Sequence, residues 1–330
     1  MRKEKVAKYK KAAKAGNANA ENKLGEMYEF GKGVKKSYKK AVKWYRKAAE
    51  LGNADAQCGL AVMYERGDGI KRSYKKAAKW YRKAADQGQS KAQNNLGLLY
   101  HEGRGVQKSY EKAVGWYRKA VKQGNDAAQY NLGRLYEQGY GVEQSYKKAV
   151  KLYKKAVKKG NKYPQVALGW MYYEGKGVKQ SYKKAKKWYQ KAAKQGDCLA
   201  QNDLGVMYEL EIGVKRSYKK AVKLYKKAAK QGGKISELNL AWMYANGYGI
   251  KQSYKKAAKW YKKSAKQGEK TAQFRLGELY EEGKGVKQSY GKAEKWYSKA
   301  ADQGVEEAAT KLDLMYDDED DELVSEQDEP

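Results

Sequence analysis

The chain has few of the residues on which catalytic, metal and disulfide chemistry depends. Its 330 residues include a single histidine, His101, two cysteines, two prolines and two phenylalanines. One histidine provides little for acid–base catalysis or zinc binding, so we expect no enzyme activity, no bound metal and no cofactor. Two cysteines cannot form a disulfide framework. These absences favour a binding or structural protein over an enzyme.

Long hydrophobic runs are also missing. No apolar segment approaches the roughly 20 residues of a membrane-spanning helix. The amino-terminal segment 1–10 is basic but lacks the apolar stretch of a secretory signal peptide. We therefore expect a soluble, intracellular protein with no transmembrane segment, whose exact compartment the sequence does not specify.

What the chain has in excess is positive charge and tyrosine. Lys and Arg number 72 against 38 Asp and Glu, which gives a formal net charge of +34, and there are 31 tyrosines. A charge of this size suggests an acidic partner, but by itself it does not predict a fold.

The sequence repeats itself every 36 residues. Glycine recurs in strict register at Gly16, Gly52, Gly88, Gly124, Gly160, Gly196, Gly232, Gly268 and Gly304. Leucine, Met-Tyr or Leu-Tyr, Ser-Tyr and Trp-Tyr or Leu-Tyr pairs recur in the same register, without insertion or deletion. A fixed period of this length is typical of helical repeat proteins. We therefore expect one continuous array rather than two domains.

Each repeat has the pattern of two helices. In the first repeat, Leu24 and Tyr28 lie on one face of the first predicted helix, and a Gly-x-Gly loop then breaks it. Ser37 is placed to cap a second helix that buries Tyr45 and ends at Gly52. The fold class is therefore predicted to be all-α.

The register divides the chain as follows. We expect an amino-terminal half-repeat, 1–16, that acts as a capping helix, a carboxy-terminal half-repeat helix, 305–316, and an acidic, disordered tail, 317–330. Eight full repeats, numbered 1 to 8 below, lie between them: 17–52, 53–88, 89–124, 125–160, 161–196, 197–232, 233–268 and 269–304.

The consensus resembles a known family. The pattern Leu-Gly-x-Met-Tyr-x-x-Gly-x-Gly-Val-x-x-Ser-Tyr-x-Lys-Ala-x-x-Trp-Tyr-x-Lys-Ala-Ala-x-x-Gly is similar to the Sel1-like repeat, a relative of the tetratricopeptide repeat. This resemblance implies a right-handed α/α superhelical solenoid that acts as a scaffold or adaptor without catalysis. It also implies a protein partner, whose identity the sequence does not provide, and we expect a monomer.

Two residues that depart from the consensus, and the two cysteines, carry further information. Glu211 replaces the first loop glycine of repeat 6, so that loop is expected to be distorted. Pro164 falls in the first turn of a predicted helix, where its missing N–H costs little. Cys58 and Cys198 are nearly four repeats apart, too far to form a disulfide, which favours a reducing compartment.

The positive charge falls almost entirely on the second helices. The body of the chain carries +43 and the acidic tail −9. In the first repeat a stripe of cations opposes the predicted buried face: Lys36, Lys39, Lys40, Lys43, Arg46 and Lys47. This stripe has three interpretations. It is a solvated face that provides solubility, a sequence-independent binding surface for polyanions (nucleic acid, acidic lipid or acidic protein), or a docking surface for the acidic tail.

The first helices carry a second candidate surface. Positions equivalent to 22, 26 and 29 point away from the predicted packed face, with position 30 at its edge, and they are apolar mainly from repeat 4 onward. The side chains concerned are Tyr130, Val166, Trp170, Tyr173, Val206, Leu210, Leu238, Trp242 and Phe274. They form either a concave groove that binds a protein partner or contacts that stabilise the stacking of first helices.

Other conspicuous residues are expected to be structural. The tryptophans of the second helices, Trp44, Trp80, Trp116, Trp188, Trp260 and Trp296, are predicted to lie in the core. His101 is equivalent to Glu29 and is predicted to be solvated. The Gly-x-Gly loops connect helices and do not follow strands, so they do not indicate a nucleotide site.

Overall fold

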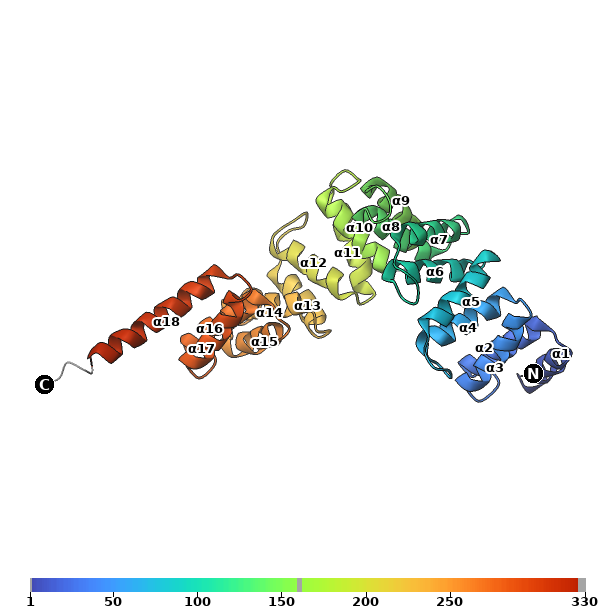
Figure 1. The fold of residues 1–330 in the computed structure, drawn as a ribbon. Coiled ribbons are helices and arrows are strands. Elements are labelled where there is room, and N and C mark those ends of the chain that lie inside the picture. Colours follow the sequence, from blue (N-terminus) through green and yellow to red (C-terminus); the bar gives the residue numbers. More distant parts are fainter. Residues whose placement is uncertain (1, 159–161, 326–330) are drawn as a thin grey trace. The chain divides into compact units, whose positions relative to one another are not determined.

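The computed structural model is all-helical and describes residues 2–158 and 162–325. That part of the chain contains 18 helices and no strand (Figure 1). The helices are α1 (Arg2–Lys14), α2 (Ala18–Phe30), α3 (Tyr38–Glu50), α4 (Ala54–Arg66), α5 (Tyr74–Asp86), α6 (Ser90–Glu102), α7 (Tyr110–Lys122), α8 (Asp126–Gln138), α9 (Tyr146–Val157), α10 (Lys162–Glu174), α11 (Tyr182–Lys194), α12 (Cys198–Glu209), α13 (Tyr218–Ala229), α14 (Lys234–Asn246), α15 (Tyr254–Lys266), α16 (Lys270–Glu281), α17 (Tyr290–Ala301) and α18 (Glu306–Ser325). Each repeat therefore folds as the predicted pair of helices.

Local capping explains where these helices begin and end. The Asn17 side chain accepts a hydrogen bond from the Ala20 N–H at the start of α2, and Ser37 accepts one from the Lys40 N–H at the start of α3. The first helix ends at Gly31, whose φ of 70° is left-handed and favours glycine. Equivalent caps recur along the chain, so each repeat sets its own helix boundaries.

The core of each repeat is built around a tyrosine ring on the second helix. Tyr45 is 3% exposed and packs between the first helices of its own and the next repeat. Its ring lies against Gly25 on one side and Gly59 on the other, and a Cβ at Gly25 would come within 2.5 Å of the ring. Glycine inside these helices is therefore explained by close approach of the tyrosine rather than by flexibility.

The second glycine of each loop joins neighbouring repeats. Gly69 has a φ of +69° and lies on the backbone of Tyr38 and Lys39, at the start of the preceding second helix. Gly105 lies in the same way on Tyr74 and Lys75. The loop therefore holds the amino terminus of a helix in the preceding repeat as well as connecting two helices of its own.

A buried amide ladder makes a second connection between repeats. Gln57 donates to the Ala49 carbonyl of the preceding repeat at 3.1 Å and accepts from Gln87 of its own repeat at 2.8 Å. In repeat 1 the equivalent pair is Glu21 and Leu51. Leu51 is 58% exposed, and one carboxylate oxygen of Glu21 is buried without a hydrogen bond. Repeat 1 therefore lacks the side-chain hydrogen bond that is equivalent to the one between Gln87 and Gln57.

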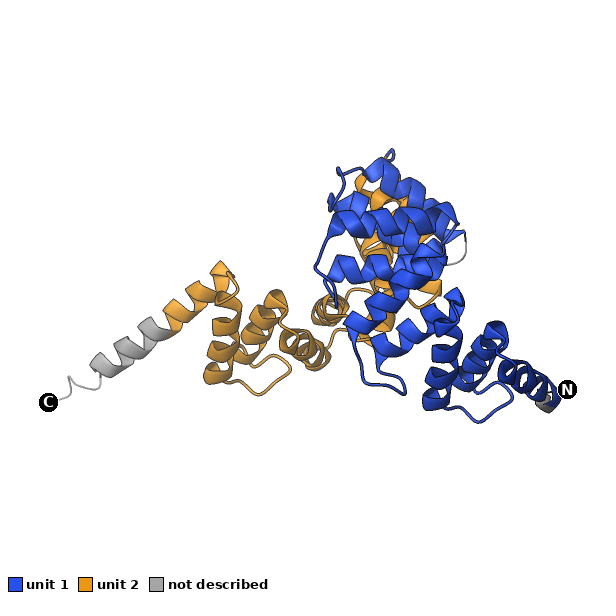
Figure 2. Ribbon diagram, turned by 45° about the vertical axis from the view of Figure 1, so that its right-hand side comes forward, with its two compact units in different colours: residues 1–164, 176–179 blue, residues 165–175, 180–330 orange. Residues whose placement is uncertain are grey.

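The described residues form two compact units (Figure 2). The first comprises Met1–Pro164 and Lys176–Lys179, and the second comprises Gln165–Gly175 and Gln180–Pro330. The division falls within repeat 5, near the start of α10. Pro164 lies in the first turn of α10, as expected.

Two segments differ from the sequence-based expectation. The loop at Glu211 keeps its turn rather than being distorted, because Glu211 itself takes the left-handed conformation with a φ of 63°. Its carboxylate lies 3.5 Å from the Arg216 guanidinium. Helix α18 continues past residue 316 to Ser325, into the segment where a disordered tail is expected, and residues 326–330 lie outside the described part.

The loop contact predicts a difference between two kinds of glycine. Gly105→Ala should destabilise the protein by about 2 kcal/mol or more beyond the cost of its left-handed backbone, because the new methyl group would overlap the Tyr74 and Lys75 backbone. Gly88 also has a left-handed φ of +90°, but a Cβ added there would meet no atom within 4 Å. Gly88→Ala is therefore the matched control. Thermal unfolding of both variants, followed by circular dichroism, measures the difference, and equal losses would contradict the contact.

Candidate functional site

A row of tyrosine–carboxylate hydrogen bonds runs through the array. The hydroxyl of Tyr45 donates to Glu29 at 2.6 Å, from the second helix of repeat 1 to its first helix. Four further repeats have the same bond: Tyr81–Glu65, Tyr153–Glu137, Tyr225–Glu209 and Tyr297–Glu281. Burial raises the pKa of Tyr45, and the bond to Glu29 raises it further. Each tyrosine is therefore a neutral donor, and its acceptor is a carboxylate.

This row corrects one prediction. Position 29 was expected to face away from the packed side, but Glu29 is 9% exposed and reaches the buried tyrosine. A long side chain at the edge of the helix face can reach a hydroxyl that lies deeper, which the position of its Cα on a helical wheel does not reveal.

Repeat 3 has lost its carboxylate. His101 stands where five other repeats have glutamate, and it packs edge-on against Tyr110 at 5.4 Å between ring centroids. The Nδ1 atom of His101 and the hydroxyl of Tyr117 are both buried without a hydrogen-bond partner. Burial lowers the pKa of His101, and the charge of Arg134 lowers it further. The prediction of a solvated histidine is therefore wrong.

In repeat 5 the next repeat provides the carboxyl group that lies beside the tyrosine. Tyr173 stands at the glutamate position, and Asp203 of α12 provides the acidic group beside the Tyr189 hydroxyl. Desolvation raises the pKa of Asp203 to about 6, and the charge of Asp197 adds to the rise. Hydrogen bonds from Asn202 and Tyr189 oppose it. Asp203 is therefore a carboxyl group whose ionisation is disfavoured by burial.

Repeat 7 has neither of these substitutes for the glutamate: it has no histidine at that position and receives no aspartate from the next repeat. Ala245 stands at the glutamate position, and Tyr261 has no hydrogen bond among the described residues. A cavity of about 290 Å³ lies in front of this tyrosine. Its lining residues are Trp242, Ala245, Asn246, Tyr254, Tyr261, Arg275, Glu278, Leu279, Glu282 and Lys284. The sequence pattern pointed to Trp242 but not to this site; the signal was Ala245, which with His101 and Tyr173 is one of three replacements of a repeated glutamate.

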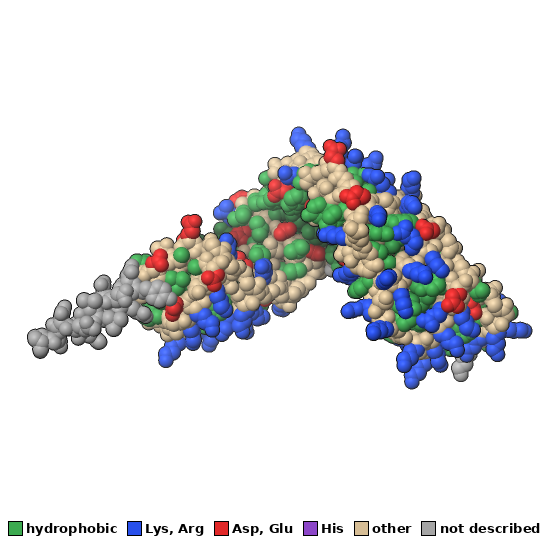
Figure 3. Space-filling model, in the orientation of Figure 1, with side chains coloured by type: hydrophobic (Ala, Val, Ile, Leu, Met, Phe, Trp, Pro, Cys, Tyr) green, Lys and Arg blue, Asp and Glu red, His purple; other side chains and the backbone are tan. Residues whose placement is uncertain are grey.

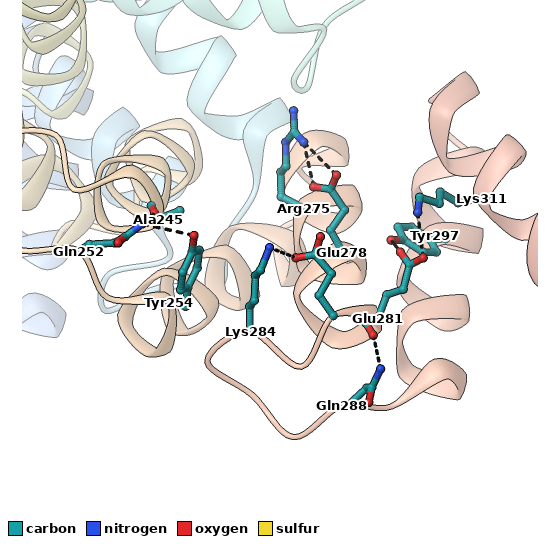
Figure 4. A network of polar contacts seen from close by, with 11 residues as sticks. Ala245, Gln252, Tyr254, Arg275, Glu278, Glu281, Lys284, Gln288, Tyr297 and Lys311 are labelled. Carbon is teal, nitrogen blue, oxygen red and sulfur yellow. Dashed lines mark hydrogen bonds and ion pairs between the residues drawn. The ribbon is translucent and has the colours of Figure 1, made fainter.

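Two ion pairs line the same cavity. The Arg275 guanidinium binds both carboxylate oxygens of Glu278, at 3.1 and 2.9 Å, and Lys284 lies 2.8 Å from Glu282 (Figure 4). Lys284 also lies over the Tyr254 ring, at 5.9 Å from its centroid. The wall of the cavity therefore combines aromatic surface with two cations, each paired with a glutamate.

The predicted groove residues fall into two groups. Those equivalent to position 22 are half-buried: Tyr130, Val166, Leu238 and Phe274. Leu238 and Phe274 pack against the core of the second compact unit, as does Val206, and Phe274 lies 5.6 Å from the Tyr297 ring. Tyr130 lies 5.8 Å from the Tyr153 ring. Most side chains of this group therefore contact the packed core, which favours the interpretation that they stabilise the stacking of first helices.

The second group is more accessible. Leu210 is 56% exposed and Trp242 is 37% exposed. Trp170 and Tyr173 are half-buried, and the Tyr173 ring lies 5.3 Å from Tyr182. Within the second compact unit, Leu210 and Trp242 are thus the predicted groove residues with the most exposed apolar surface.

The cationic stripe is exposed, and part of it contacts aromatic rings. All six predicted residues, Lys36 to Lys47 of repeat 1, are exposed, and Lys and Arg cover much of the surface seen in Figure 3. Lys40 lies over the Tyr28 ring at 5.5 Å, and the equivalent lysine does so in every repeat, as at Lys112–Tyr100 and Lys256–Tyr244. These cation–π contacts provide a local role that the sequence did not suggest.

The second-helix tryptophans are less buried than predicted. Trp116 is 8% exposed, but the other five are half-buried. Lys119 covers the Trp116 ring at 4.0 Å, and Lys47 covers Trp44 at 5.4 Å. These tryptophans therefore lie at the edge of the core, with lysine side chains over them.

Other chemistry finds little support in the described residues. Within 2–158 and 162–325, no three His, Cys, Asp or Glu side chains are grouped as metal ligands. None of the helices described is long and apolar enough to span a membrane. Cys58 and Cys198 are both free thiols, and burial raises the pKa of Cys58 to about 12.

Comparisons with known proteins agree with this architecture. The family model of the Sel1 repeat matches residues 18–53, 54–89, 90–125, 126–161, 165–197, 198–233, 235–269 and 270–305. A crystal structure of c5321, a protective antigen of uropathogenic Escherichia coli, is 37% identical with a TM-score of 0.83, over 94% of this chain and 67% of that one. A Sel1 repeat protein from Oxalobacter formigenes is 32% identical with a TM-score of 0.71, over 94% and 89%. The search of curated proteins found no match.

Repeat 3 predicts a stabilising substitution. His101→Glu should place a carboxylate beside the Tyr117 hydroxyl, as Glu65 lies beside Tyr81, and should remove the unpaired Nδ1. We expect a gain of about 1–3 kcal/mol in stability. Thermal unfolding measures it, with His101→Ala as the control that removes the imidazole without providing an acceptor. A melting temperature no higher than that of His101→Ala would contradict the expected bond.

Repeat 5 predicts a pH dependence. Because the folded-state pKa of Asp203 is raised to about 6, its ionisation costs stability at neutral pH, and this cost disappears as the pH falls toward the unfolded-state value. Wild type should therefore gain about 1–2 kcal/mol relative to Asp203→Asn between pH 7 and pH 4. Urea unfolding of both proteins across this range tests the effect, and a constant difference would refute it.

Proposed function

Because this chain belongs to the Sel1 repeat family, we propose that it is a non-enzymatic scaffold that binds a protein partner through the first helices of its second compact unit. The supporting observation is the exposure of two large apolar side chains at predicted groove positions, Leu210 at 56% and Trp242 at 37%. Exposed aromatic and aliphatic side chains of this kind are typical anchors of protein interfaces.

The position of these side chains also supports the proposal. Leu210 follows the end of α12 and Trp242 lies on α14, the first helices of adjacent repeats. The Trp242 ring packs on Tyr248 at 5.0 Å, so it is held in place rather than free to rotate. An anchor that is already ordered loses less conformational entropy when a partner binds.

A second candidate function rests on the cationic stripe. In repeat 1, none of the six exposed cations from Lys36 to Lys47 lies in an ion pair with an acidic side chain of the described part of the chain, and Lys36, Lys40 and Lys47 also lie over aromatic rings. Such a surface would bind nucleic acid or another polyanion independently of sequence, with an affinity that falls steeply with salt. Solubility remains the simpler interpretation of the same charges.

The groove proposal predicts a selective loss of partner binding. The double variant Leu210→Ala/Trp242→Ala should bind the partner at least about tenfold more weakly, because two exposed apolar anchors are removed. The helix content and melting temperature should change little, because both side chains are substantially exposed. Affinity capture with quantitative mass spectrometry, at low and high salt, identifies partners that depend on these residues.

Phe30→Ala provides the matched control. Phe30 is equivalent to Leu210, is 59% exposed and lies in repeat 1, outside the proposed surface. Partners that the double variant loses and Phe30→Ala retains at high salt would support the groove. Partners that disappear with salt alone would instead favour the cationic stripe, and collapse of the fold in the double variant would assign both residues to the core.

A further inference from the structure

The repeated tyrosine–carboxylate hydrogen bond indicates what the Tyr261 hydroxyl of repeat 7 can bind. In five repeats the hydroxyl at this position donates to a glutamate of the same repeat, with distances of 2.5 to 2.6 Å in four of them, as at Tyr45–Glu29. In repeat 7 the tyrosine, Tyr261, remains, but Ala245 replaces the glutamate. The chain therefore retains a carboxylate-binding hydroxyl and lacks its carboxylate, and both Tyr261 and Ala245 line a cavity.

Repeat 8 provides the complete arrangement beside the incomplete one. There, Glu281 accepts from the Tyr297 hydroxyl and also forms a 2.8 Å ion pair with Lys311 of α18, as Figure 4 shows. Arg275 stands in repeat 8 at the same register as Lys311 in the next half-repeat. Tyr261 and Arg275 are therefore the counterparts of Tyr297 and Lys311, and the group between them is missing.

Repeat 3 is the informative contrast. Tyr117 also lacks its glutamate, but the larger His101 side chain occupies that position, and the tyrosine hydroxyl is buried. In repeat 7 the small Ala245 side chain provides no acceptor, and Tyr261 lines a cavity of about 290 Å³. Pockets at the same register also occur in repeats 1 and 2, where Glu29 and Glu65 line them, so repeat 7 differs by lacking the carboxylate rather than by having a cavity.

The cations of the cavity retain unused hydrogen-bond donors. Arg275 uses one terminal nitrogen, Nη1, for both bonds to Glu278, and a guanidinium has five N–H groups. Lys284 makes one ion pair, with Glu282, and an ammonium has three N–H groups. Each glutamate is thus neutralised by its own cation, while donors remain for an incoming anion.

We propose that the cavity beside Ala245 binds the carboxylate of a glutamate or aspartate side chain from the partner protein. This inference rests on the proposed function, since the partner's chain lies over Trp242 at the rim. The incoming carboxylate accepts from the Tyr261 hydroxyl and pairs with Arg275, in the place that Glu281 takes between Tyr297 and Lys311 in repeat 8.

The rim of the cavity favours a peptide side chain over a free metabolite. The exposed Trp242 ring extends the site outward as an apolar surface, which suits the backbone and neighbouring side chains of an extended peptide.

The first experiment tests the site with a carboxylate alone. Sodium propionate is titrated into the full chain labelled with carbon-13 at the tyrosine ring, and the Tyr261 signal is assigned with Tyr261→Phe. We expect a saturable shift of this signal with propionate and none with propionamide at equal ionic strength. Ala245→Glu should abolish the shift by filling the site, whereas His101→Glu, the same change in repeat 3, should leave it intact. An unmoved Tyr261 signal, or an equal shift in Ala245→Glu, would overturn the proposal.

The second experiment uses displayed peptides as the probe. A random twelve-residue library is selected on the wild-type chain at high salt and counter-selected on Ala245→Glu, which keeps every lysine of the cationic stripe. Enriched peptides should share an acidic residue whose change to Gln or Asn weakens binding at least tenfold, and Tyr261→Phe should weaken the same peptides similarly. Tyr117→Phe is the matched control and should leave binding unchanged.

The two experiments separate two kinds of failure. A parallel selection on wild type without the counter-selection is therefore included. Peptides from it that bind wild type and Ala245→Glu equally, yet lose affinity for Leu210→Ala/Trp242→Ala, would overturn the carboxylate site and leave the proposed function standing. If neither selection yields a peptide, the proposed function loses its support, and the propionate titration still decides whether the cavity accepts a carboxylate.

Discussion

The structure depends on one contact, a tyrosine ring packed between two first helices, in most repeats against a glycine of the first helix of its own repeat. Tyr45 between Gly25 and Gly59 is the example in repeat 1. Bringing a helix so close to an aromatic ring buries much apolar area and leaves no room for a Cβ at the glycine in its present position. In repeats 2 and 7, Ala61 and Ala241 stand at this position and are fully buried, so the packing there has adjusted to one methyl group.

This contact also explains why carboxylates lie inside so basic a protein. A buried tyrosine hydroxyl requires an acceptor, and Glu29 or its equivalent provides one from the first helix. The glutamates are therefore part of the packing, whereas the lysines lie outside it, over the aromatic rings at the edge of the core. The charge of the second helices and the acidity of the first helices have separate physical causes.

The sequence predicted the fold well because the fold is local. Helix caps such as Ser37 and loop glycines such as Gly31 are read directly from the 36-residue register. The site was predicted less well, because it depends on contacts between helices that a wheel of one helix does not contain. Position 29 appeared exposed on such a wheel, although its side chain crosses to a tyrosine sixteen residues later. The site at Ala245 lies where that crossing side chain is missing, so it can be recognised only when both helices of the repeat are seen together.

The buried amide hydrogen bonds make the amino-terminal repeat different from the repeats that follow it. In repeats 2, 3, 6 and 8 these bonds tie the repeat both to itself and to a carbonyl of the repeat before it, as Gln57 does with Gln87 and Ala49. In repeat 1, Leu51 provides no donor for Glu21, and one carboxylate oxygen there is buried unpaired. In a protein whose repeats are stabilised mainly by their neighbours, the end with the weakest coupling opens first. Breathing motions of the array should therefore begin at its amino terminus, and hydrogen exchange would be fastest there.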